Sequence, residues 1–393
     1  MKKIVNTDET RKQNQKLILD HIRDNGPLSS AKIAKKLKVP AGTIARVTAS
    51  LLNKNLLRIE KGKKRNTVGK PPIMLNINKK FALIAGVELN ELSTTVIITD
   101  FQGNILSKKN IKTFSILDDL STKLIDLIYS SIKDIKMSID LLKGVGIGLS
   151  GIMSNDGKYI VQGFLPEGYP IVDLLEKKLN IPVFAGNDAA FAVLAEKRFG
   201  AGKKYNNIVY LLDRGWLGMG LFLNNMLYEG CNKAAGELMA GISNGIKNEK
   251  IVDFPFIESY GLEKNIKNLD FTDLYIKDFS SREEFIYNLA NLAKNGNKKA
   301  MELLDREVSS FAIAIARLVA VFNPDILVLA GDIVLAREVI ENKIYDEFKN
   351  LKKKYANISS TDFKFSTLSQ NEVALGAAVV AIEEISNMKL NEK

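Results

Sequence analysis

The 393-residue sequence contains very little cysteine and histidine: Cys231 and His21 are the only residues of their kinds. One cysteine cannot form an internal disulfide bond. A zinc site built from cysteine and histidine needs three or four such ligands, so a single chain of this composition excludes one, and we expect no bound metal. A Ser-His-Asp triad would have to use His21, which lies in a segment of unrelated character.

Long apolar runs are also missing. No stretch approaches the roughly 18 uncharged apolar residues of a membrane span, and the initial Met1-Lys2-Lys3 is not followed by the apolar segment of a signal peptide. We therefore expect a cytoplasmic protein without a membrane partner. With 46% hydrophobic and 26% charged residues, the composition is that of a well-cored globular chain, which excludes a fibrous or largely disordered protein. Its length allows two or three domains.

Positive charge is concentrated at one end of the chain. Residues 1–80 contain 20 Lys/Arg and 5 Asp/Glu, a net charge of +15, whereas the remainder contains 36 and 40, a net charge of −4. A basic block on a slightly acidic body is typical of a module that binds a polyanion such as DNA, attached to something else.

The basic block has the pattern of a winged helix-turn-helix. Two short helices are joined by a four-residue turn, Val39-Pro40-Ala41-Gly42, and follow a longer first helix with Leu17, Ile18 and Ile22 on its apolar face. Two strand patterns then flank a basic loop that contains glycine and proline, which predicts the wing. The helical patterns cover residues 16–22, 28–37 and 43–52, and the strand patterns cover residues 56–60 and 73–77.

In a winged helix-turn-helix, the third helix enters the major groove and the wing contacts the backbone or the minor groove. Arg46 is placed either to read a guanine or to bind a phosphate. An alternative is a protein-binding winged helix whose lysines are simply solvated. The predicted contacts to double-stranded DNA are Ser30, Thr43, Arg46 and Thr48 in the helices, and Lys63, Lys64, Arg65 and Lys70 in the wing.

The body shows the same strand-strand-strand-helix-strand order twice, which predicts an α/β fold with two similar lobes and a cleft between them. The first copy comprises strands at 81–89, 94–100 and 104–111, a helix at 117–138 and a strand at 144–149. The second comprises strands at 207–212, 218–223 and 224–228, a helical region ending in 308–322 and a strand at 325–331, and a helix at 372–385 closes the chain.

Several local strings resemble those of the ROK family (repressors, open reading frames and sugar kinases). They are Gly69-Lys70-Pro71-Pro72, Gly186-Asn187-Asp188-Ala189, Ala235-Gly236-Glu237-Leu238 and Phe256-Ile257-Glu258-Ser259. The resemblance covers essentially the whole chain and implies an actin/hexokinase-like, ribonuclease H-like two-lobed ATPase-fold body. Within that family, a winged helix before the body is the layout of the xylose- and N-acetylglucosamine-type repressors. The implied domains are the winged helix at 1–78, a first lobe at 79–190 plus 365–393, and a second lobe at 191–364.

The resemblance also implies a sugar pocket formed by Asn187, Asp188, Glu237 and Glu258. In the kinases of the family, the aspartate that matches Asp188 takes the proton from the sugar hydroxyl. From the residues alone, Asn187 or Asp188 can equally be the N-cap of the helix that follows, and either glutamate can be an ordinary solvated charge. Carboxylates and an amide are suited to bind vicinal hydroxyls.

The segments that would hold ATP and zinc depart from the family pattern. At residues 88–92, both glycines and the threonine of the first phosphate turn are absent, and side chains obstruct the close approach that glycine permits. The second turn, at residues 213–220, retains three glycines but includes Trp216, which we expect to fill nucleotide space. Residues 241–255 contain no cysteine or histidine, and Ala240 replaces the family's histidine. We therefore expect neither zinc nor another cofactor.

These observations favour a sugar-responsive DNA-binding transcriptional regulator, in particular a repressor of carbohydrate-utilisation genes, that forms a homodimer or tetramer and has lost ATP-dependent catalysis. One alternative is an ATP- and Mg²⁺-dependent sugar kinase that carries a DNA-binding domain, with Asp188 as its general base. A third reading is a DNA-binding protein whose body has lost its ligand and only dimerises.

Overall fold

The structure is a computed structural model. It describes residues 8–61, 73–91, 93–113, 119–214, 217–238, 282–354, 360–368 and 370–392. The chain divides into two compact units, the first formed by Met1–Ser150, Gly157–Ala185 and Ala377–Lys393, and the second by Gly151–Asp156 and Gly186–Gly376. The residue ranges of the three domains stay predictions, because this division has two parts.

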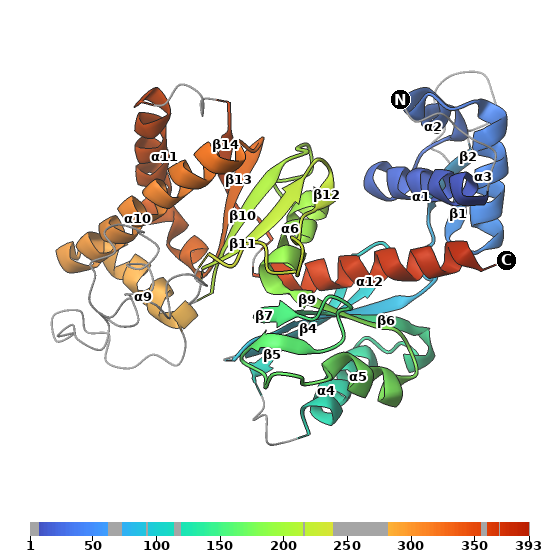
Figure 1. The fold of residues 1–393 in the computed structure, drawn as a ribbon, viewed down its shortest axis with the longest axis horizontal. Coiled ribbons are helices and arrows are strands. Elements are labelled where there is room, and N and C mark those ends of the chain that lie inside the picture. Colours follow the sequence, from blue (N-terminus) through green and yellow to red (C-terminus); the bar gives the residue numbers. More distant parts are fainter. Residues whose placement is uncertain are drawn as a thin grey trace. The chain divides into compact units, whose positions relative to one another are not determined.

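A small helical head opens the first unit, as predicted (Figure 1). Strands β1 and β2 pair antiparallel, with Leu57 opposite Ile77, and they form the base of the wing; the basic loop between them lies outside the described residues. The elements of the head are α1 (Asp8–Asn25), α2 (Ser30–Leu37), α3 (Ala41–Asn53), β1 (Leu57–Lys61) and β2 (Ile73–Ile77).

The core of the head differs from the prediction at one residue. Leu17 is 50% exposed, whereas Ile18, Leu19 and Ile22 are buried. Leu19 lies three residues before Ile22 and therefore shares its helix face, while Leu17 falls one step outside that stripe. The assignment of Leu17 to the buried face is wrong for this reason.

The rest of the first unit is built on a five-stranded sheet with the order β5-β4-β3-β6-β9. Strand β3 pairs antiparallel with β4 and parallel with β6, and all seven of its residues are buried. The elements are β3 (Leu83–Leu89), β4 (Ser93–Asp100), β5 (Ile105–Lys112), α4 (Leu120–Asp134), the 3₁₀ helix Ile139–Leu141, β6 (Leu142–Leu149), β8 (Ile160–Gly163), α5 (Ile171–Leu179) and β9 (Val183–Asn187).

The second unit repeats this order in the sheet β12-β11-β10-β13-β14. Its first strand again pairs antiparallel with the second and parallel with the fourth. The predicted repeat of three strands, helix and strand is thereby confirmed. The elements are β7 (Gly151–Met153), α6 (Asp188–Phe199), β10 (Ile208–Asp213), β11 (Leu217–Leu223), β12 (Met226–Leu227), α9 (Arg282–Lys294), α10 (Lys298–Phe322), β13 (Ile326–Gly331), the 3₁₀ helix Asp332–Ala336, α11 (Arg337–Lys354) and β14 (Asp362–Phe365).

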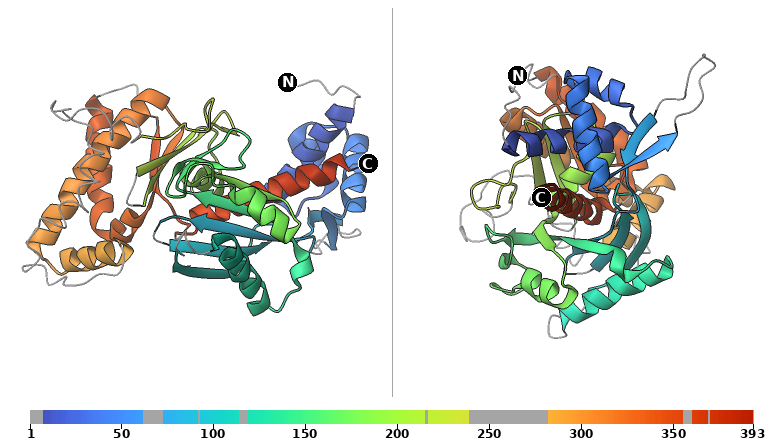
Figure 2. Two further views of the ribbon diagram at one scale, coloured as in Figure 1. Left: turned by 60° about the horizontal axis from the view of Figure 1, so that its bottom comes forward. Right: turned by 90° about the vertical axis from the view of Figure 1, so that its right-hand side faces the viewer.

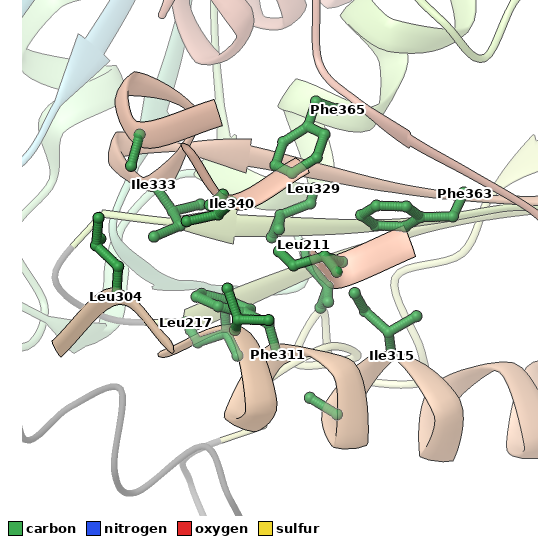
Figure 3. Packing of buried hydrophobic residues seen from close by; sticks show 14 of the residues in the cluster. Leu211, Leu217, Leu304, Phe311, Ile315, Leu329, Ile333, Ile340, Phe363 and Phe365 are labelled. Carbon is green, nitrogen blue, oxygen red and sulfur yellow. The ribbon is translucent and has the colours of Figure 1, made fainter. Parts of the chain in front are cut away.

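Both faces of the second sheet are covered, and strand β10 shows how. Its alternate residues Val209 and Leu211 join a core with α9, α10 and α11 (Figure 3). Tyr210 and Leu212 point to the other face, against Ala189 and other residues of α6. The alternation follows from the two-residue repeat of a strand, so the near-continuous apolar run of β10 matches a strand buried on both sides.

Helix α12 (Glu372–Asn391) closes the chain and runs six residues beyond the predicted end at residue 385. Its first five residues belong to the second unit and the remainder, from Ala377 onward, to the first. None of the helices in the described ranges is long and apolar enough to cross a membrane.

Candidate functional site

The junction between β9 and α6 positions the first two candidate side chains. Asn187 is the last residue of β9 and the N-cap of α6, because its Oδ1 accepts a hydrogen bond from the Ala190 N–H at 3.0 Å. Its Nδ2 donates to the Gly151 carbonyl at 3.2 Å and to Glu237 Oε1 at 3.4 Å. The amide of Asn187 therefore holds the first residue of β7 and the loop of Glu237 beside the start of α6.

Asp188 is the first residue of α6, and its Oδ1 accepts a hydrogen bond from the Ala189 N–H at 2.7 Å. The pKa of Asp188 is raised to about 7, chiefly by burial; the Ala189 N–H lowers it, the nearby carboxylate of Glu237 raises it, and the positive charge of Arg214 lowers it. Burial also raises the pKa of Glu237. Near neutral pH, Asp188 can therefore either donate a hydrogen bond to a hydroxyl or accept one, which is the property a general base needs.

The structure thus gathers Asn187, Asp188 and Glu237 in the second unit. The helix-cap reading holds for Asn187 but not for Asp188, since Asn187 provides the cap. Glu258 lies outside the described residues, as does Ala240. In the described part of the chain, no three histidine, cysteine or carboxylate side chains gather so as to hold a metal ion.

Arg214 was not among the predicted site residues, and it lies at the second predicted phosphate turn. It directly follows β10, and its Nη1 forms ion pairs with Asp332 at 3.1 Å and with Glu283 at 3.2 Å. Its Nη2 lies 3.5 Å from Glu372 Oε1 and 3.4 Å from the Gln370 carbonyl. Asp332 and Glu372 are almost fully buried. We call Arg214, Glu283, Asp332 and Glu372 the Arg214 cluster.

One feature of the sequence could have indicated the Arg214 cluster. Arg214 is a basic residue directly after a buried strand, at the strand end where the kinases of the family bind phosphate. Its acidic partners are 69 to 158 residues away in the sequence, so no local pattern predicts them. Gly331, at the end of β13, has φ +87, and a Cβ there would lie 2.0 Å from the Asp213 carbonyl oxygen. Only glycine allows this close approach, which brings Asp332 to Arg214. Gly215 and Trp216 lie outside the described residues.

The first predicted phosphate turn, between β3 and β4, is closed by its own hydrogen bonds. The Ser93 N–H donates to Asn90 Oδ1 at 2.8 Å, and the Asn90 N–H donates to the Ser93 carbonyl at 3.1 Å. Thr113 Oγ1 donates to the Asn90 carbonyl at 2.7 Å. The N–H groups of both Asn90 and Ser93 are therefore bonded within the protein.

The head carries the second candidate site, and helix α3 supplies most of it. Arg46 is exposed, Thr43 is half-buried near the start of α3, and Ser30 is exposed at the start of α2. Ser29 caps α2, because its Oγ accepts a hydrogen bond from the Lys32 N–H. These three predicted residues are thus accessible in the head. The wing residues Lys63, Lys64, Arg65 and Lys70 lie outside the described residues.

Thr48 corrects the predicted interface. It is only 4% exposed, and its Oγ1 donates to the Ile44 carbonyl one helical turn earlier, at 2.8 Å. Thr48 lies one residue after the buried Val47 and four after the buried Ile44, so it belongs to the core stripe of α3. Its placement on the exposed face is wrong.

Exposed lysines on α2 were not among the predicted contacts. They carry positive charge over the whole length of this helix, and they accompany Arg46 as part of the basic head. The residues are Lys32, Lys35, Lys36 and, at the C-cap, Lys38.

The winged head and the two repeated α/β sheets define a DNA-binding module fused to a sugar-kinase-type body. Comparison with known proteins gives the family. Residues 84–384 match the model of the ROK family, and residues 12–64 match that of the MarR family. The chain belongs to the ROK family, and the winged helix that the sequence predicts at residues 1–78 is of the MarR type.

Similar proteins support the same class over nearly the full length. The xylose repressor of Bacillus spizizenii is 29% identical over 381 residues, which cover 95% of this chain and 96% of that protein. The DNA-binding transcriptional dual regulator NagC of Escherichia coli is 22% identical, with 86% and 84% covered. The protein is accordingly a ROK-family transcriptional repressor.

Two solved structures confirm the fold. A ROK family transcriptional regulator, a homologue of the E. coli MLC protein, superimposes with a TM-score of 0.74 at 19% identity and covers 97% of both chains. A ROK family glucokinase from Streptomyces griseus, in complex with glucose and AMPPNP, has a TM-score of 0.63 at 19% identity and covers 76% of this chain and 99% of its own. The glucokinase therefore matches the body.

Proposed function

We propose that the protein represses carbohydrate-utilisation genes by binding operator DNA through its head, and that a neutral sugar bound at Asn187, Asp188 and Glu237 controls this binding. The observation that carries the proposal is the joint presence of a basic winged helix and a gathered amide-carboxylate site in one chain. As a DNA-binding protein it acts in the cytoplasm. It acts as a dimer or tetramer, because a helix-turn-helix protein commonly reads two half-sites one helical turn apart.

DNA binding is tested through its salt dependence. A duplex selected from a random pool by the full chain should bind with an affinity that falls steeply with salt, because phosphate contacts release counterions. Lys35→Ala, Lys36→Ala, Lys63→Ala and Lys64→Ala should each reduce the slope of log K against log salt by about one. Lys349→Ala, an exposed lysine of α11, is the matched control. A salt-independent affinity contradicts the proposal.

The oligomeric state is tested separately: the mass of the protein–DNA complex reports whether two chains bind one duplex.

Sugar binding is tested by thermal shift and calorimetry against a panel of pentoses, hexoses and N-acetylhexosamines. A sugar that binds only the folded state raises the melting temperature. Asp188→Asn and Glu237→Gln should abolish the shift, whereas Glu347→Gln, an exposed glutamate of α11, should leave it unchanged. A panel without any shift favours the reading in which the body only dimerises.

The second candidate function is an ATP-dependent sugar kinase, which the position and raised pKa of Asp188 favour. The closed Asn90 turn and the Arg214 cluster oppose it, because both occupy segments where the family's kinases hold phosphates. The protein in our proposal needs neither ATP, Mg²⁺ nor zinc. A coupled assay with ATP, Mg²⁺ and the sugar panel decides: phosphorylation that Asp188→Ala abolishes would establish the kinase.

A further inference from the structure

Helix α12 contacts α6 closely within the second unit. A Cβ on Gly376 would lie 1.8 Å from the carbonyl oxygen of Phe191, so the two helices meet backbone to backbone. Val373 of α12 packs in the same core as Ala189 and Ala192 of α6, and Glu372 joins the Arg214 cluster at 3.5 Å from Nη2.

This contact lies one helical turn from the candidate sugar site. Asp188 begins α6, and Phe191 follows three residues later. Because no flexible side chain separates Gly376 from the α6 backbone, a displacement of the first turn of α6 cannot be absorbed there by a change of rotamer. The first turn of α12 must follow it or lose the contact.

The other end of α12 contacts the head within the first unit (Figures 1 and 2). Ser386 Oγ accepts a hydrogen bond from Arg23 Nη2 at 2.7 Å and donates to the Ile382 carbonyl at 2.6 Å. Arg23 belongs to α1 and is only 6% exposed. Its Nη1 pairs with Asp20 at 2.8 Å, and its guanidinium lies over the ring of Phe101. These contacts fix the direction of the guanidinium toward α12.

The recognition helix α3 is attached to the same end of α12. Lys54, the C-cap of α3, donates from Nζ to the carbonyls of Lys389 at 3.1 Å and Glu392 at 2.6 Å. The last carbonyls of a helix carry partial negative charge, which a lysine satisfies. The direction of α12 therefore influences both the first and the third helix of the head.

We propose that α12 transmits the state of the sugar site to the DNA-binding head, with Arg23, Lys54 and Ser386 as positioning residues at its far end. This inference rests on the proposed function and names its route of regulation. A sugar that shifts the first turn of α6 moves the start of α12 through Gly376, and the polar contacts at its end change the orientation of α1 and α3. The sugar and the duplex then both favour one position of α12 over another. An allosteric coupling between two sites requires such a shared element.

The test compares duplex affinity with and without the sugar that the panel identifies, using full-length protein. In the wild type, the sugar should change the affinity about tenfold or more. In Ser386→Ala and Arg23→Gln, the sugar and the duplex should each still bind, but the change should shrink to less than about threefold. Lys16→Gln, an exposed lysine of α1, is the control. A full sugar response in both variants overturns the inference and leaves the proposed function intact.

A second measurement needs neither ligand, so it decides the inference even if no sugar is found and the proposed function fails. Glu372→Gln weakens the contact of the α12 start with Arg214. It should raise hydrogen exchange in α1 and in the last turns of α12, and this increase should disappear in the Ser386→Ala background. Unchanged exchange in the head, or the same increase in both backgrounds, contradicts transmission through α12.

Discussion

The two sheets share one strand order, yet the turns after their first strands are closed by different chemistry. After β3, the Asn90 turn is closed by neutral hydrogen bonds among Asn90, Ser93 and Thr113. After β10, Arg214 is held by carboxylates from three distant segments. Both turns match places where the kinases of the family bind phosphate, so the two units differ most clearly in how these corresponding turns are closed.

The difference predicts how each unit responds to mutation. A neutral turn near the surface contributes little, because water replaces its hydrogen bonds when they are lost. An arginine that is 14% exposed and paired with two buried carboxylates is different, since removing it leaves uncompensated charge in the interior. Stability should therefore depend strongly on the turn of the second unit and weakly on that of the first.

The largest effect is expected from Arg214→Met. It leaves Asp332 and Glu372 buried without their cation and should reduce the free energy of unfolding of the second unit by about 3–5 kcal/mol. Arg214→Lys should recover part of this, because lysine keeps the charge but not the planar fork. Urea denaturation followed by hydrogen exchange measures the loss.

A matched control for Arg214→Met is Lys343→Met, which removes the ion pair between Lys343 and Asp305. Both of these side chains belong to the same unit and are more exposed than Arg214. Exposed pairs contribute about 0–1 kcal/mol. Equal losses in Arg214→Met and Lys343→Met would contradict the structural importance of the Arg214 cluster.

An intermediate effect is expected from Asp188→Asn, and it should depend on pH. The pKa of Asp188 is about 7 in the folded protein, against an ordinary value of 3.8. Between these values the folded state keeps a proton that the unfolded state has released, so stability falls as pH rises and levels off above pH 7.

Asparagine does not titrate, so the variant should lose this decline, which amounts to about 2 kcal/mol between pH 5 and pH 7. Denaturation at several pH values checks it, with Glu347→Gln as control. An identical pH profile in wild type and Asp188→Asn would show that Asp188 titrates normally. Arg214→Met should shift the decline to higher pH, because the positive charge of Arg214 lowers the pKa of Asp188.

The smallest effect is expected from Asn90→Ala. It removes the acceptor of the Ser93 N–H and should destabilise the first unit by about 0.5–1.5 kcal/mol. Asn90→Asp retains an acceptor oxygen at the same place and should lie nearer the wild type. A loss in Asn90→Ala as large as that in Arg214→Met would remove the contrast between the two turns.

Local patterns predicted most of the fold because each depends on neighbours in the sequence. The helices of the head, the base of the wing and the repeated strand order follow from apolar spacing and turn residues. Asn187 was recognisable as a helix cap for the same reason. The errors also have local causes: Leu17 lies just outside the buried stripe of α1 and Thr48 lies within that of α3, and at such positions periodicity alone does not decide exposure.

The sequence by itself determined the class of the protein. Its charge distribution indicates a basic winged head, and its apolar periodicity indicates a duplicated α/β pattern. Through its resemblance to the ROK family, the sequence also indicated Asn187, Asp188 and Glu237 as candidate residues of the sugar site. Only the tertiary structure decided that Arg214 meets Asp332 and Glu372, and that Arg23 meets Ser386, residues 363 positions apart. The physical reason is that ion pairs and buried hydrogen bonds depend on distance in space, and folding alone brings such residues together.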